Sequence, residues 1–349
     1  MLRFRRSVNV NEIAVLCRQF SVLMNAGITI VEAVSILRSQ SENKYLEEVL
    51  ADVHNQLQMG NLLSQALRKY DDIFEEFLIN MVVVGEASGT LDEIMERLAE
   101  YYERNNKINQ KIKSAMTYPV ILAVLTVAVV ILLMVKVLPM FAGIMIQMGG
   151  TMPGLTRALM AVSEFFVRNV FLIIFTIAAL AVGMRYLVKT DKGKAWYDGV
   201  KLAIPGVKAI NVKIITARFS RSLSILLKSG IPIMNAIDIV KSLIGNTVIE
   251  RKFEACSEDM RSGKGISGPI QNLNFFPKLL ERMVAVGESS GELDEMLGRT
   301  ASFFDSEVEE AIDRLTVMIE PLMIVVLGAV VGIIIVSIML PMISVMTSI

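Results

Sequence analysis

The chain has 349 residues, 53% of them hydrophobic, and its mean hydropathy is +0.54. These values are too high for a wholly soluble protein of this length and indicate the membrane class. Its 35 basic and 35 acidic residues cancel, which argues against nucleic acid or an acidic substrate as a partner. The charged residues fill 1–113 and 185–320 and nearly vanish between these ranges, so two polar regions are separated by an apolar one.

The first polar region predicts a series of short helices. Asn9 and Glu12 have the spacing of a capping box at the start of a helix over 9–27, and Gly27 suits the left-handed residue that ends it. Thr29 opens a second helix by the same device. Further helices are expected over 43–59, 62–68 and 75–84.

A stretch over 81–93 occurs twice. Residues 283–295 repeat it 202 positions further on, with ten of its thirteen residues unchanged, which indicates a duplicated structural unit. In the first copy we expect Gly85 to end the fifth helix, Glu86 to Gly89 to form a tight turn, and Thr90 to cap a sixth helix. The candidate residues of this turn and its second copy are Gly85, Glu86, Gly89 and Leu91, and Gly287, Glu288, Gly291 and Leu293.

Three apolar stretches are long enough to cross a bilayer as helices. They cover about 119–138, about 170–188, and the stretch that begins at Pro321. Twenty residues at about 1.5 Å each give roughly the 30 Å thickness of a hydrocarbon core. Pro321 stands 202 positions after Pro119, so each copy of the repeat ends in a membrane segment.

The second polar region predicts the same helices again. A helix from Gly206 to Lys228 should end at Gly230, which stands 203 positions after Gly27. The fourth helix of this copy is expected to be short or irregular, because Gly265, Gly268 and Pro269 are poor helix formers.

The sequence therefore predicts an all-α fold with two repeated cytoplasmic six-helix bundles and three transmembrane helices. The expected divisions are a bundle over 1–117, two spans with a short outer loop over 118–188, a second bundle over 189–320, and a third span with a short outer tail over 321–349.

Lysine and arginine beside the spans predict the orientation. Basic residues precede the first span and follow the second, whereas the connection over 139–169 holds only two. We therefore expect a multi-pass protein of the inner cell membrane, with the N-terminus in the cytoplasm and the C-terminus outside. The basic residues are Arg104, Lys107, Lys111 and Lys113, then Arg185, Lys189, Lys192 and Lys194. Both copies enter the membrane in the same direction.

The sequence shows no catalytic, cofactor-binding or metal-binding motif. It lacks a GxxxxGK[ST] phosphate loop, and its one histidine, His54, has no neighbouring ligand set. Cys17 and Cys256 have no metal-ligand spacing and are interpreted as reduced packing residues. Methionines at 140, 145, 148 and 152 could bind a soft metal, but packing or a partner surface is the preferred interpretation.

Two acidic residues have competing interpretations. Glu86 and Glu288 could be paired catalytic carboxylates or ligands of a hard cation. The preferred interpretation is that each accepts hydrogen bonds from backbone donors in its own turn. Glu320 and Arg185 are ionisable groups at the membrane edge, where anchoring at the interface is preferred over a functional role.

In these features the chain resembles the type II secretion system F family. That family includes the inner-membrane platform proteins of type IV pili, type II secretion and competence pseudopili. The resemblance covers nearly the whole chain. It is carried by the turns over 84–93 and 286–295, by Gly27-Ile28 and Gly230-Ile231, by Tyr118-Pro119 and Glu320-Pro321, and by Met152 to Thr156.

The resemblance implies a platform without enzymatic activity. Its expected partners are a hexameric assembly or retraction ATPase, pilins or pseudopilins, other subunits of the inner-membrane machinery, further copies of the chain, and the lipid bilayer. The alternatives are a membrane transporter and a sensor subunit with cytoplasmic helical domains. A transporter would need polar groups at mid-membrane, where the spans offer only Thr126, Thr176 and Ser337.

Overall fold

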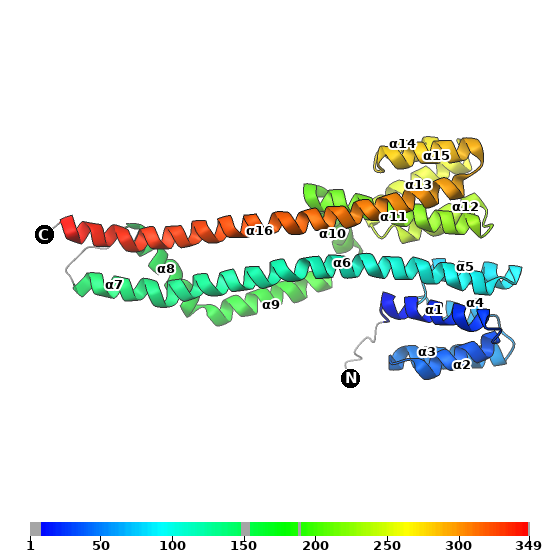
Figure 1. The fold of residues 1–349 in the computed structure, drawn as a ribbon, viewed down its shortest axis with the longest axis horizontal. Coiled ribbons are helices and arrows are strands. Elements are labelled where there is room, and N and C mark those ends of the chain that lie inside the picture. Colours follow the sequence, from blue (N-terminus) through cyan, green and yellow to red (C-terminus); the bar gives the residue numbers. More distant parts are fainter. Residues whose placement is uncertain (1–7, 148–153, 188–189, 348–349) are drawn as a thin grey trace. The chain divides into compact units, whose positions relative to one another are not determined.

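The computed structural model describes residues 8–147, 154–187 and 190–347, and every regular element in them is a helix (Figure 1). The all-α class is therefore confirmed. The chain groups into two compact units. The first unit holds Met1–Lys111 and Ala195–Glu310, and the second holds Ile112–Lys194 and Ala311–Ile349.

Bundle 1, within residues 8–111 of the first unit, contains the predicted short helices. They are α1 (Val10–Asn25), α2 (Ile30–Gln40), α3 (Lys44–Gln58), α4 (Leu63–Arg68), α5 (Glu76–Ser88) and the start of α6 (Leu91–Leu132). The capping box of α1 is confirmed, because Glu12 accepts a hydrogen bond from the Asn9 N–H at 2.6 Å while Asn9 caps the helix start. Gly27, with φ +80°, takes the left-handed conformation expected after α1.

Bundle 2, within residues 195–310 of the first unit, repeats this order. It holds most of α10 (Asp191–Ala203), α11 (Pro205–Lys228), α12 (Ile233–Leu243), α13 (Thr247–Arg261), α14 (Ser267–Asn272), α15 (Lys278–Ser290) and the start of α16 (Leu293–Thr347). Gly230 has the same φ as Gly27, +80°. The fourth helix is short, as predicted, but α14 and α4 both have six residues, so the copies do not differ in its length.

The turn between the fifth and sixth helices differs from the prediction. Gly85 does not end α5, which continues to Ser88, and it is Gly89 that takes the left-handed conformation, with φ +71°. In bundle 2, Gly287 likewise lies inside α15, and Gly291 follows the helix with φ +78°. The predicted turn over Glu86 to Gly89 is therefore wrong.

A close approach of two helices explains the glycine inside α5. A Cβ atom on Gly85 would lie 3.1 Å from the Cα atom of Leu91 and 3.1 Å from the side chain of Ile94. A Cβ atom on Gly287 would lie only 2.7 Å from the Cα atom of Leu293. Leu91 and Leu293 are both buried, so this glycine lets the sixth helix pack directly on the fifth.

The predicted cap of the sixth helix is also changed. The Thr90 hydroxyl lies 2.7 Å from the Ser88 hydroxyl, while the Thr90 carbonyl accepts from the Ile94 N–H. In bundle 2, where Glu292 replaces the threonine, the Ser290 hydroxyl accepts from the Glu292 N–H at 3.3 Å.

The second unit holds the apolar helices. Within it α6 continues past Pro119 to Leu132, a π-helical turn η1 (Leu133–Val137) follows, and α7 (Leu138–Gln147) keeps the chain helical beyond the predicted end of the first span. The unit also contains α8 (Gly154–Arg168), α9 (Val170–Leu187) and the end of α16, which includes Pro321. The Ser163 hydroxyl donates to the Met134 carbonyl in η1 at 2.8 Å.

Among the described residues, two helical stretches are long and apolar enough to cross a membrane, Leu91–Phe141 and Leu293–Ser337. They contain the first predicted span and most of the third. The remaining predicted span, 170–188, coincides with α9 but is not one of these two stretches, so it stays a prediction. Met148 and Met152 of the methionine-rich segment lie outside the described residues.

Candidate functional site at the bundle junction

The two glutamates of the repeated stretch do not form a pair. Glu86 accepts hydrogen bonds from the Leu63 N–H at 2.5 Å and from the Ser64 hydroxyl at 2.5 Å, at the start of α4. Glu288 accepts from the N–H groups of Ile266 and Ser267, at 2.6 and 3.0 Å, at the start of α14. Each therefore holds the fourth helix of its own bundle. Backbone acceptance was the preferred prediction, but the donors lie more than twenty residues away rather than in the same turn.

This contact has an electrostatic consequence for Glu288. Partial burial acts to raise the pKa of its carboxyl, but hydrogen bonds from the Ser267 side chain and from the Ile266 and Ser267 N–H groups outweigh it. The pKa is therefore held below its usual range. The N–H groups at a helix start carry partial positive charge, so a carboxylate is the favoured partner there. Glu288 acts as an ionised cap, which is a structural role.

The other predicted site residues lie at helix ends or inside helices. Gly27, Gly89, Gly230 and Gly291 follow helices with positive φ, while Pro119, Glu320 and Pro321 lie inside α6 or α16. Within the described residues, no group of three or more His, Cys, Asp or Glu side chains is placed to hold a metal ion. Cys17 and Cys256 are free and buried, and burial raises the pKa of each thiol to about 12.

One ion pair recurs at equivalent positions of the two bundles. In bundle 1, Arg18 of α1 donates two hydrogen bonds to Glu103 of α6, at 2.7 and 2.8 Å. In bundle 2, Arg221 of α11 donates to Asp305 of α16. Arg221 follows Arg18 by 203 residues and Asp305 follows Glu103 by 202. The same pair thus joins the first helix to the sixth in both copies.

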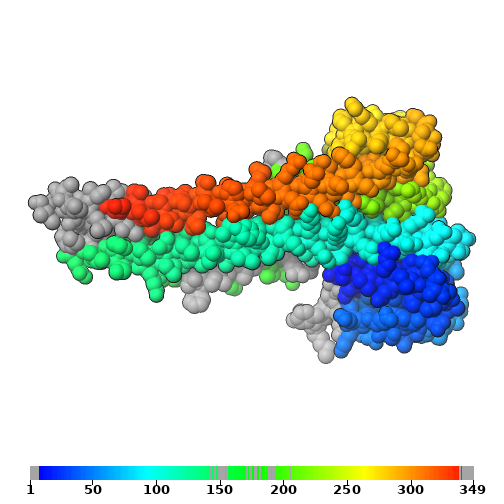
Figure 2. Space-filling view, in the orientation of Figure 1, coloured from blue at the N-terminus to red at the C-terminus, as the bar shows by residue number. Residues whose placement is uncertain are grey.

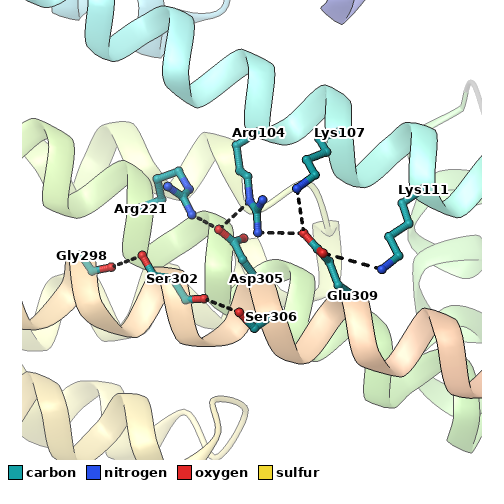
Figure 3. A network of polar contacts seen from close by, with 9 residues as sticks. All are labelled: Arg104, Lys107, Lys111, Arg221, Gly298, Ser302, Asp305, Ser306 and Glu309. Carbon is teal, nitrogen blue, oxygen red and sulfur yellow. Dashed lines mark hydrogen bonds and ion pairs between the residues drawn. The ribbon is translucent and has the colours of Figure 1, made fainter.

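The bundle 2 pair is also contacted by bundle 1. Arg104 of α6 donates from Nε to the Asp305 carboxylate at 3.0 Å, so two arginines from two bundles share one acidic side chain (Figure 3). The Asp305 side chain is only 3% exposed, whereas that of Glu103 is 45% exposed. Burial and the neighbouring Arg104 guanidinium together lower the pKa of Arg221. A buried carboxylate of this kind depends on its partners, because an unpaired charge in the interior is costly.

A second acidic residue extends the contact along α16. Glu309 lies 3.0 Å from Arg104, 3.5 Å from Lys107 and 3.6 Å from Lys111 (Figure 3). The three basic residues are spaced along one face of α6, as their sequence separations of three and four require. We call Arg104, Lys107 and Lys111 the basic ridge, and Asp305 and Glu309 the acidic ridge. The sequence interpretation used the basic ridge only for membrane orientation and missed its partners.

Apolar packing accompanies the ridges. Tyr101 of α6 is 1% exposed and packs against Phe77 of α5 with ring centroids 4.7 Å apart. Burial raises the pKa of Tyr101, although the Arg218 and Ser222 side chains of bundle 2 act to lower it. Arg97 of α6 donates to the Ser229 hydroxyl at the end of α11, at 3.5 Å. Figure 2 shows the cyan α5 and early α6 between the blue helices of bundle 1 and the green helices of bundle 2.

The junction joins two helical bundles and positions them through ion pairs between α6 and α16. Together with the two long apolar helices, it defines a class: a membrane protein whose duplicated helical bundles are held together by complementary charge.

Comparison with known proteins makes this assignment more specific. Residues 16–139 and 219–341 match the family described as type II secretion system (T2SS), protein F. The chain is 38% identical to the type IV pilus assembly protein PilC of Thermus thermophilus, over 97% of this chain and 83% of that protein. It is 34% identical to PilC of Myxococcus xanthus, over 97% and 81% of the two chains, and 32% identical to the type II secretion system protein F of Pseudomonas aeruginosa, over 98% and 85%.

The chain belongs to the type II secretion system protein F family, the inner-membrane platform proteins of type IV pilus and type II secretion machinery. Platform proteins of this family are not enzymes, which agrees with the expectation from the sequence. The two matched regions end in the two long apolar helices, so the family match and the internal repeat divide the chain in the same way.

Proposed function

We propose that this protein couples a cytoplasmic assembly or retraction ATPase to the insertion of pilins or pseudopilins into a fibre, or to their extraction from it. In this proposal both bundles lie in the cytoplasm, three spans cross the inner membrane, and the C-terminus lies outside. The proposed divisions are 1–117, 118–188, 189–320 and 321–349. The names of the relatives support a fibre or secretion machine, and the absence of a nucleotide-binding motif requires an energy source outside the chain.

The observation that carries the mechanism is the paired ridges of the junction. A force on either bundle would act on both, because Arg104 and Lys107 of α6 pair with Asp305 and Glu309 of α16. Both α6 and α16 continue without a break past Pro119 and Pro321 into apolar sequence. We propose that an ATPase turns or shifts the joined bundles and that these two helices pass the motion to pilins in the membrane.

Deletion of the gene tests the role in assembly. The ATPase and the pilin should remain at normal levels while no fibre forms, and the wild-type gene should restore fibres. A purified tagged protein should retain the ATPase and prepilins. Normal fibres in the deletion strain would overturn the proposal.

Cysteine labelling tests the orientation separately. Asp71 and Glu258 lie in different bundles, so a cysteine at either position should react only when the inner side of the membrane is accessible. Labelling of the two positions from opposite sides would contradict the proposed topology.

A further inference from the structure

The continuous helix α6–η1–α7 and the helix α16 carry a proline at equivalent positions. Leu138-Pro139-Met140 recurs 202 positions later as Leu340-Pro341-Met342. Pro139 lies in the first turn of α7, and Pro341 lies inside α16. A proline has no N–H, so each one leaves a backbone carbonyl of the preceding turn without its usual donor. In apolar surroundings such a carbonyl is costly unless another group donates to it.

In the first copy the carbonyl left without a donor is that of Met134. The turn η1 is π-helical, so an N–H bonds to the carbonyl five positions earlier, as the Leu138 N–H does to the Leu133 carbonyl. The next donor in this register is residue 139, a proline, and its acceptor is Met134. The Ser163 hydroxyl of α8 donates to this carbonyl at 2.8 Å. A side chain from another helix thus takes the place of the missing N–H.

In the second copy the carbonyl left without a donor is that of Ser337. The chain around Pro341 is α-helical, so the missing N–H is the usual donor to the carbonyl four positions earlier. The Thr156 hydroxyl of α8 donates to the Ser337 carbonyl at 2.6 Å. Thr156 and Ser163 therefore reach the two carbonyls that the equivalent prolines deprive of an N–H.

These two bonds differ from the usual behaviour of a hydroxyl in an apolar helix. A serine or threonine there commonly donates to the carbonyl four positions earlier in its own helix, as Thr176 of α9 does to Leu172 at 2.7 Å. Thr156 and Ser163 are 3% and 4% exposed, and each donates to a different helix instead. Their hydroxyls therefore connect helices rather than satisfy their own.

One face of α8 can reach both helices. Seven residues separate Thr156 from Ser163, which is close to two turns, so the two side chains leave the same face about 10 Å apart along the axis. The axes of packed helices are about 8–10 Å apart. A short helix lying across two neighbours can thus place one hydroxyl on each, and Figure 1 shows α8 beside both.

We infer that α8 is a bridge that holds the two copies of the repeat together outside the bundles, with Thr156 and Ser163 as its positioning residues. Each hydroxyl replaces the N–H that one proline removes, so each bond has one defined acceptor. The bridge consists of hydrogen bonds between uncharged groups, so salt does not screen it as it screens the ridges. Its contacts lie within one chain, so its test needs neither the ATPase nor pilins and is independent of the proposed function.

Restoring the missing N–H tests the inference. In the full-length protein in detergent, Ser163→Ala and Thr156→Val should each lower the melting temperature by about 2–4 °C. In a Pro139→Ala background the backbone again supplies a donor, so Ser163→Ala should lower it by less than half as much, while Thr156→Val keeps its full effect. In a Pro341→Ala background the two effects should be exchanged.

This crossed pattern separates a replaced donor from simple packing. Equal losses in all three backgrounds would overturn the inference, because a side chain that only packs does not respond to the proline of one helix. Thr176→Val is the matched control, since its hydroxyl bonds within its own helix, and its effect should not depend on either proline. Thr156→Ser keeps the hydroxyl and should retain the wild-type melting temperature. A loss equal to that of Thr156→Val would contradict the bridge.

The positioning role has a measurement of its own. Met140 of α7 and Met339 of α16 are 66% and 55% exposed, so spin labels on cysteines at these positions report the distance between the two helices. The two native cysteines are replaced by alanine for this purpose. In lipid bilayers the distance distribution should be narrow in the parent protein and broader when Thr156→Val and Ser163→Ala are combined. An unchanged distribution would overturn the positioning role.

Discussion

Bundle 1 and bundle 2 carry the same ion pair in different surroundings, and the surroundings decide what the pair does. Arg18–Glu103 stands at the surface, with side chains 36% and 45% exposed, where water and salt screen the charges. Arg221–Asp305 stands at the junction, where the carboxylate is 3% exposed and takes a second arginine from the other bundle. The pair is therefore a surface contact in bundle 1 and part of an interface in bundle 2.

The difference between the two ion pairs is tested most directly by removing the acidic residue of each pair. Asp305→Ala leaves Arg221 partly buried without its carboxylate and should destabilise the protein by about 3–5 kcal/mol. Glu103→Ala exposes Arg18 to water and should cost about 1 kcal/mol or less. Melting temperatures of the full-length variants in detergent measure both effects, and equal losses for the two variants would contradict this account.

The next largest difference in stability between the bundles is expected at the glycine of the fifth helix on which the sixth helix packs. Gly287→Ala places a methyl group 2.7 Å from a backbone atom, the Leu293 Cα, and should destabilise bundle 2 by about 3 kcal/mol, because backbone cannot move aside cheaply. At Gly85 the nearest contacts are 3.1 Å, so Gly85→Ala should cost less. Limited proteolysis within each bundle, followed by identification of the cleavage sites, would report which bundle has loosened.

Acidification should affect the cap formed by Glu288. The folded-state pKa of this group lies below its unfolded value, so its stabilising contribution is present above the unfolded pKa of about 4.3 and is lost as pH falls through the folded value. Glu288→Gln should therefore cost about 2 kcal/mol at pH 7. Denaturant unfolding as a function of pH should show the gap between wild type and variant closing below about pH 4. A constant gap at every pH would rule out an ionised cap.

The smallest expected effect comes from a charge exchange across the ridges. Lys107→Glu should destabilise the junction by about 1 kcal/mol or less, because Lys107 is exposed, and Glu309→Lys should cost more, because the new lysine also faces Arg104 and Lys111. The double variant, which restores opposite charges 202 residues apart, should recover part of the loss. A double-mutant cycle at low salt measures this coupling. A coupling energy of zero would mean that the Lys107 contact adds nothing to the junction.

The helices and their ends could be predicted because their causes are local. The capping box of Asn9 and Glu12 and the left-handed Gly27 depend on residues within a few positions, and the repeat supplied a second reading of each. The sequence did not show that Gly89, rather than Gly85, ends α5. Both glycines suit a helix end, and only the close approach of Leu91 to Gly85 decides between them.

Most contacts of the candidate site could not be predicted from the sequence. The preferred interpretation of Glu86 gave it backbone donors but chose the wrong turn, since its partners at Leu63 and Ser64 are brought to it by tertiary folding. The ridges were visible only as charges at helical spacing. One signal was available: Lys107 and Glu309 occupy equivalent positions with opposite charge, which is the pattern expected where two copies of a unit face each other.

That both ridges belong to one polypeptide has a consequence for their exposed ion pairs. A pair such as Lys107–Glu309, worth about 1 kcal/mol or less, could not hold two free molecules together at cellular concentrations. Tethering replaces the encounter of two molecules by an internal equilibrium with an effective concentration in the millimolar range. A joint of this kind can stay formed for most of the time and still be opened by a modest load, and it always has one partner of each kind.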